Sequence, residues 1–175
     1  YMQNMLGFSA LKSGMMIMPG AILMGITSPI AGRIYDKIGA RPLAITGLSI
    51  VTITTFFFTR LSTETTFLYL ATVFGFRMLG IAMVLMPITT EGLNQLELDL
   101  IPHGTAMNNT MRQVSASIGT AILVTVMTMT AIDTGPGADP SDLIYGVNVA
   151  FGVATALALA GVVLSFFVKP SARDS

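Results

Sequence analysis

The spacing of the charged residues constrains this chain most, because it leaves five apolar runs of membrane-spanning length. A helix needs about 20 mostly apolar residues to cross the hydrocarbon core of a bilayer. Charged residues make up 10% of the chain, against about 25% in soluble domains, and the mean hydropathy is +0.75. We therefore predict an integral membrane protein whose spans cover residues 13–32, 42–59, 66–90, 104–132 and 144–168.

The apolar runs predict helices rather than the strands of a membrane barrel. A barrel strand needs about ten residues that alternate between apolar and polar side chains. These runs are instead apolar on every side and much longer than a barrel strand. The expected fold class is therefore an all-α, multi-pass helical bundle embedded in a lipid bilayer.

Lysine and arginine orient the bundle, because they are enriched in the cytoplasmic loops of membrane proteins. With five spans, one side holds only Lys12 and Arg60, and the other side holds Arg33, Lys37, Arg41, Lys169 and Arg173. The second side is expected to face the cytoplasm, together with the C-terminus and the connection 94–102. The loop 134–142 is expected outside the cell. The formal net charge of zero gives no indication of a nucleic-acid partner.

No pattern in the sequence indicates catalysis or a metal site. The chain has no cysteine, and its single histidine, His103, follows a proline where a capping or interfacial role is expected. Neither a nucleophile elbow nor a phosphate-binding loop occurs. The sequence therefore predicts no enzyme activity, no metal and no cofactor.

Arg77 lies near the middle of the third predicted span. A guanidinium at the bilayer centre costs at least about 2.5–3.5 kcal/mol on insertion scales, so Arg77 should face protein or a water-filled cavity. We interpret it as a candidate residue of a substrate or proton pathway. The alternative is a structural arginine that is satisfied by backbone carbonyls or a polar neighbour.

Arg112 lies on a polar face of the fourth predicted span. The spacing of three and four residues places Asn108, Asn109 and Arg112 on one helical face, with Gln113 to one side. Such a face on a membrane helix is expected to point into the bundle, where it forms interhelical hydrogen bonds or lines a pathway. Interhelical hydrogen bonds account for the asparagines. Arg112 either belongs to a pathway or extends toward the cytoplasmic interface.

The segment GRIYDKIGARP, residues 32–42, places four charges between the first two spans. A positively charged anchor on the cytoplasmic side accounts for its Lys and Arg but not for Asp36. Glu91 ends the third span and is expected on the same side of the membrane. It is either solvated there or forms a salt bridge with Arg41 or Lys37.

This segment resembles the cytoplasmic loop between the second and third helices of each half of a major facilitator superfamily transporter. The residues that match its G-x-x-x-D-[RK]-x-G-x-[RK] pattern are Gly32, Asp36, Lys37, Gly39 and Arg41. The stretches 1–42 and 103–127 resemble the C-terminal half of the fourteen-helix drug/proton antiporters of EmrB/QacA type, and the second is similar to lincomycin-resistance (Lmr-type) members. The likeness covers nearly all 175 residues. It implies a fragment with the last five helices, in which YMQNML ends an earlier helix.

The resemblance implies a bacterial exporter of lipophilic drug-like molecules, driven by protons, that works by alternating access with a missing N-terminal half. It also implies that the loop residues and Glu91 form a conformational latch. In this latch Asp36 would meet a helix N-terminus, and Gly32 and Gly39 would permit close approach and a tight reversal. Two alternatives remain open: a facilitator or symporter of another small solute, and a membrane receptor or assembly subunit without transport.

Overall fold

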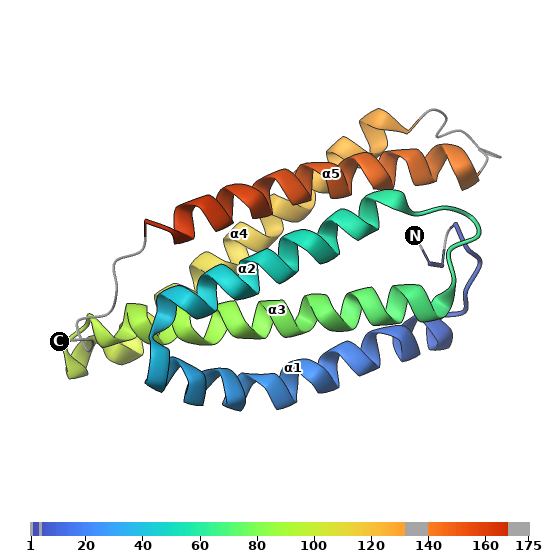
Figure 1. The fold of residues 1–175 in the computed structure, drawn as a ribbon. Coiled ribbons are helices and arrows are strands. Elements are labelled where there is room, and N and C mark those ends of the chain that lie inside the picture. Colours follow the sequence, from blue (N-terminus) through green and yellow to red (C-terminus); the bar gives the residue numbers. More distant parts are fainter. Residues whose placement is uncertain (1, 4, 132–139, 168–175) are drawn as a thin grey trace.

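The computed structural model describes residues 2, 3, 5–131 and 140–167 and shows five long helices that run side by side (Figure 1). Each helix is long and apolar enough to cross a membrane. Regular structure within the described residues is helical throughout, which confirms the all-α membrane class. The long helices are α1 Ala10–Ile38, α2 Ala40–Phe57, α3 Phe67–Asn94, α4 Ile101–Thr130 and α5 Pro140–Ser165, and the one-turn helices are η1 Phe58–Arg60 and η2 Leu98–Leu100.

The helices extend beyond the predicted spans at most of their ends. Helix α1 begins at Ala10, because the Ser9 side chain caps it by accepting a hydrogen bond from the Lys12 N–H at 3.2 Å. It continues to Ile38, so most of the expected loop 32–42 is helical and only Gly39 separates α1 from α2. Charges limit the apolar core of a span, but they do not end a helix, whose backbone hydrogen bonds persist outside the hydrocarbon region.

The packing order places α3 between α1 and α2, while α5 packs against both α2 and α4 (Figure 1). We call the end of the bundle with the α1–α2 turn the Gly39 end, and the opposite end, where α2 leads into α3, the Leu61 end. Helix α4 contains no buried residue, so its sides are largely open within the described part of the chain. The loop predicted at 134–142 and the tail with Lys169 and Arg173 lie mostly or wholly outside the described residues.

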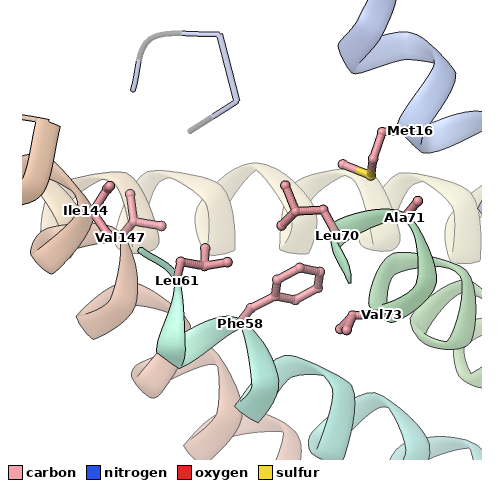
Figure 2. Packing of buried hydrophobic residues seen from close by; sticks show 8 residues of the cluster. All are labelled: Met16, Phe58, Leu61, Leu70, Ala71, Val73, Ile144 and Val147. Atoms are coloured by element: carbon pink, nitrogen blue, oxygen red, sulfur yellow. The ribbon is translucent and has the colours of Figure 1, made fainter. Parts of the chain in front are cut away.

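A cluster of buried apolar side chains joins the helices at the Leu61 end (Figure 2). Its members come from α1, α3, α5 and the η1 region, and they are Met16, Phe58, Leu61, Leu70, Ala71, Val73, Ile144 and Val147. The Phe58 ring stacks on the Phe151 ring of α5 with centroids 5.2 Å apart. Lipid tails are as apolar as these side chains, so close packing rather than escape from water stabilises the cluster.

Glycines bring α2 and α3 into backbone contact in the middle of the bundle. A methyl group added at Gly47 would lie 2.8 Å from the Gly80 carbonyl oxygen, and one added at Gly80 would lie 2.9 Å from the Gly47 carbonyl oxygen. A similar approach joins α5 to α4, where Gly146 lies against the Met127 carbonyl. Small residues at these crossings let the backbones approach, which is how membrane helices gain packing energy.

Asn148 on α5 ties this helix to the segment that follows η1. Its Oδ1 accepts a hydrogen bond from the Leu61 N–H at 3.1 Å, and its Nδ2 donates to the Leu61 carbonyl oxygen at 2.9 Å. One side chain therefore satisfies both polar groups of a buried residue that lies outside any helix. Backbone groups at membrane depth need such partners.

Candidate functional site

A cavity of about 520 Å³ lies between α3 and α4 toward the Gly39 end. We call it the α3–α4 cavity. Its apolar wall includes Val84, Ile88, Met107 and Met111, and its polar lining includes Thr89, Asn108, Arg112 and Ser115. A pocket with an apolar wall and a few polar groups is the usual form of a small-molecule site.

Two smaller cavities among the described residues lack such polar groups. One of about 210 Å³ lies between α4 and α5, and one of about 360 Å³ lies between α2 and α3. The hydroxyls that line them, those of Thr54, Thr72 and Thr120, donate to carbonyls of their own helices. The α3–α4 cavity is therefore the stronger candidate site.

The structure brings part of the predicted polar face of α4 to this cavity. All four side chains are exposed, but only Asn108 and Arg112 line the cavity, and Asn109 and Gln113 do not. The Arg112 Nη2 donates to Asn109 Oδ1 at 3.5 Å, at the limit of a hydrogen bond. Arg112 is the one ionisable side chain among the residues that line the cavity.

Arg77 lies outside the lining of the α3–α4 cavity, seven residues before Val84 on α3. Its Nε atom is buried and has no hydrogen-bond partner among the described residues. The structural alternative, in which a backbone carbonyl or polar neighbour satisfies this atom, is therefore not observed in the described part of the chain. A buried guanidinium nitrogen without a partner calls for an explanation beyond packing.

The two predicted latch glycines differ in their surroundings. Gly39 has φ +78°, a conformation that glycine adopts without strain, and the chain reverses there. Gly32 has no tight neighbour, since an added methyl group would meet only the Met86 Cε at 3.9 Å. The expected close approach at Gly32 is therefore absent from this structure.

Asp36 and Lys37 point away from the bundle. Both are exposed, and neither the N-terminus of α2 nor that of α4 receives a hydrogen bond from a capping side chain. The expectation that Asp36 meets a helix N-terminus is therefore wrong for this conformation. The reason is that α1 remains helical to Ile38, which turns the Asp36 side chain outward while Tyr35 points inward.

Glu91 pairs with Tyr35 instead of a basic residue. The Tyr35 hydroxyl donates to Glu91 Oε2 at 2.6 Å, and Asn94 Nδ2 donates to the same hydroxyl at 3.4 Å. The salt bridge expected between Glu91 and Arg41 or Lys37 does not occur among the described residues. Tyr35 was not among the residues predicted from the sequence, although its position four residues after Ala31 places both on one buried face of α1.

Arg41 binds the end of another helix. Its Nη2 donates to the Phe166 carbonyl oxygen at 3.1 Å, just past the last residue of α5. The last carbonyls of a helix lack partners within the helix and carry partial negative charge, which a cation stabilises. The segment 32–42 thus contacts a helix C-terminus through Arg41 and joins α2 to α5.

The described residues contain no group of three or more His, Cys, Asp or Glu side chains that would hold a metal ion.

Comparisons with known proteins agree with the sequence resemblance. Residues 1–120 match the family model of the Major Facilitator Superfamily. The chain is 46% identical over 175 residues to the uncharacterized MFS-type transporter YcnB of Bacillus subtilis, a match that covers all of this chain and 37% of that protein.

Several of the similar proteins carry names that refer to drug resistance. The lincomycin resistance protein LmrB of Listeria monocytogenes is 38% identical over 176 residues, covering 97% of this chain and 37% of LmrB. The multidrug resistance protein Stp of Mycobacterium tuberculosis is 26% identical over 127 residues, covering 73% of this chain and 24% of Stp. The chain thus spans little more than a third of the length of YcnB and of LmrB.

These findings support a bacterial, multi-pass protein of the plasma membrane and place the chain in a family of transporters rather than enzymes. The family match covers well over half of the chain and includes the 32–42 segment and the α3–α4 cavity. The five apolar helices agree with it. The chain therefore belongs to the major facilitator superfamily.

Proposed function

We propose that this chain is part of an exporter of amphipathic, drug-like molecules that is driven by protons. The observation that carries the proposal is the similarity to LmrB along 97% of the chain. The α3–α4 cavity supports it, since its apolar wall and its few polar groups suit an amphipathic ligand. Arg77, Asn108, Asn109, Arg112 and Gln113 are the proposed pathway residues.

The transport cycle is proposed to be alternating access between this helical domain, residues 1–175, and an N-terminal half of the same protein. Sites of such transporters lie at the interface between the two halves. The open sides of α4, which bury no residue, are consistent with a surface that faces another part of the protein. One half should therefore not transport by itself.

The contacts at the Gly39 end are proposed to act as a conformational latch. Tyr35–Glu91 joins α1 to α3, and Arg41–Phe166 joins α2 to α5. The exposed Asp36 and Lys37 are then available to contact the other half in a different conformation of the cycle. By the distribution of Lys and Arg, this end and the C-terminus face the cytoplasm.

Proton coupling is proposed to use a carboxylate in the rest of the protein. No acidic side chain lines the α3–α4 cavity, and the acidic residues of the described chain lie near helix ends or between helices. A proton-carrying group in a secondary transporter is typically an ionisable residue inside the membrane. This chain therefore supplies the wall of a pathway rather than the proton carrier.

The proposal is tested with the intact transporter in proteoliposomes, under an imposed pH gradient and with a fluorescent amphipathic dye or lincomycin as cargo. We expect accumulation that depends on the gradient and stops when an ionophore collapses it. Accumulation that is unaffected by the ionophore would contradict proton coupling. Absence of accumulation for every amphipathic cargo tested would contradict drug export.

A further inference from the structure

We propose that the α3–α4 cavity binds the anionic or acceptor-rich end of an amphipathic substrate, and that Arg112 is the residue that binds this end. The inference rests on the proposed export function and names the substrate chemistry of that site. Its basis is the charge in and around the cavity, the hydrogen bonds that the charged groups make, and the apolar wall.

Arg112 supplies the charge of the cavity. It is the one ionisable residue among those that line it, and its hydrogen bond to Asn109 is 3.5 Å long. A guanidinium carries five N–H donors in a planar fork that matches a carboxylate or a phosphate. This weak bond within the same helix is the one that Arg112 makes with the described residues, and it leaves most of these donors for a ligand.

No carboxylate of the described chain competes for Arg112 in the cavity. Glu91 lies on α3 at the level of the cavity-lining residues Ile88 and Gly92. Its carboxylate accepts the hydrogen bond of Tyr35 on α1, and Glu91 is not among the residues that line the cavity. A lipophilic cation would find no counter-charge on this wall, whereas an anionic or acceptor group would find a donor.

The neighbours of Arg112 extend the polar strip and complete an amphipathic site. Asn108 lies one turn before it and Ser115 about one turn after it, and both line the cavity. Val84 and Ile88 of α3 form the part of the apolar wall that lies across the cavity, and Met107 and Met111 of α4 complete this wall. A ligand that fits has a polar end at the polar strip of α4 and an apolar body against the apolar wall.

Arg77 adds positive charge to the same face of α3. It lies seven residues, or about 10 Å along the helix, before Val84, which lines the cavity. Residues seven apart lie on nearly the same side of a helix. Its buried Nε has no hydrogen-bond partner among the described residues, and its guanidinium adds positive charge to this face. Fields of one sign in a cleft concentrate ligands of the opposite sign.

The test measures binding of matched fluorescent probes to the intact transporter in nanodiscs of phosphatidylcholine, whose zwitterionic headgroups bring no net charge to Arg112. The probes share one xanthene dye scaffold and differ in one group, a carboxylate in the first and a primary ammonium in the second. The variants are Arg112→Gln and Arg112→Lys, with Arg60→Gln at the Leu61 end as the matched control.

We expect the wild type to bind the carboxylate probe more tightly than the ammonium probe. Arg112→Gln should weaken binding of the carboxylate probe about tenfold, the loss of a charged hydrogen-bonded contact, and leave the ammonium probe within about twofold. The affinity of Arg112→Lys for the carboxylate probe should lie between those of the wild type and Arg112→Gln. Lysine keeps the positive charge but lacks the planar fork of N–H donors. Arg60→Gln should match the wild type for both probes.

Tighter binding of the ammonium probe by the wild type would overturn the inference. An equal loss for both probes in Arg112→Gln, with unchanged thermal stability, would also overturn it, since it would assign Arg112 a role unrelated to charge. The proposed function is tested separately. Preferential binding of the carboxylate probe without gradient-dependent export would support the inference and contradict proton-driven export.

Discussion

The Tyr35 hydroxyl donates a 2.6 Å hydrogen bond to Glu91 Oε2, and this bond joins the end of α1 to the end of α3. Tyr35 is 7% exposed, so its hydroxyl depends on partners in the protein rather than on solvent. Hydrogen bonds to an ionised acceptor are stronger than neutral ones. This contact therefore takes the place that a salt bridge of Glu91 would have had in the latch.

We predict that Tyr35→Phe destabilises the Gly39 end of the bundle. The variant keeps the ring but removes the donor to Glu91, which should lower the free energy of unfolding by about 1.5–3 kcal/mol. Thermal unfolding in detergent measures the change. The matched control is Tyr69→Phe, because the exposed Tyr69 hydroxyl donates to the Phe57 carbonyl oxygen at 3.0 Å. An equal loss in the two variants would contradict a special role for Tyr35–Glu91.

We predict that Gly47→Ala separates α2 from α3. The added methyl group would lie 2.8 Å from the Gly80 carbonyl oxygen and 2.6 Å from Val84 Cγ2, so the helices must move apart, at a cost of about 1–3 kcal/mol. Gly25→Ala is the control, since no atom lies within 4 Å of its added methyl group. Equal stability of the two variants would refute the close α2–α3 contact.

We predict that Asn148→Leu destabilises the Leu61 end. Leucine has a similar size but leaves the N–H and the carbonyl of Leu61 without their side-chain partner, at about 1–3 kcal/mol for each buried group. Thr128→Val on α4 is the control, because the exposed Thr128 hydroxyl bonds only to carbonyls of its own helix. The melting temperatures of the two variants are compared. Equal melting temperatures would contradict a stabilising role of the Asn148 contact.

We predict that Asp36→Asn slows transport without changing stability or topology. Asp36 is exposed and has no hydrogen bond to the described residues. Removal of its charge should therefore leave the stability of this conformation unchanged. Gradient-driven export and thermal unfolding are measured together, with Glu64→Gln at the other end as the control. Wild-type export by Asp36→Asn would reduce the segment 32–42 to a topological anchor.

We predict that Arg77→Met lowers transport while stability is unchanged or increased. Methionine removes the cost of a mid-membrane guanidinium, about 2.5–3.5 kcal/mol on insertion scales, at an atom that has no hydrogen-bond partner among the described residues. A structural arginine would behave in the opposite way, because its loss would leave backbone acceptors unpaired. Lower stability with wild-type export would therefore remove Arg77 from the proposed pathway.

The polar residues of α4 show how far the sequence predicts the candidate site. Spacing placed Asn108, Asn109 and Arg112 on one face, and the structure puts Asn108 and Arg112 in the α3–α4 cavity. The second wall, formed by residues such as Val84 and Ile88, was not predictable. Apolar residues on a membrane helix pack equally well against lipid or protein, so their pattern does not reveal which of them line a cavity.

The segment 32–42 shows the same limit for its partners. Its composition predicted a reversal and a role at one membrane face, and Gly39 makes the reversal. The expected partners of Asp36 and Glu91 were wrong, because side-chain direction depends on where α1 ends. The helix continues through the charged residues to Ile38, which directs Tyr35 rather than Lys37 toward Glu91.

The sequence by itself determined the membrane class and the five helices, because backbone groups in lipid must be paired within each span and apolar runs of this length satisfy that as helices. Only the tertiary structure decided which residues meet, such as Tyr35 with Glu91 and Arg41 with Phe166. The rotation of each helix depends on close packing, as at Gly47 and Gly80, and not on hiding an apolar face from water. That packing joins positions far apart in the chain, and no local pattern records it.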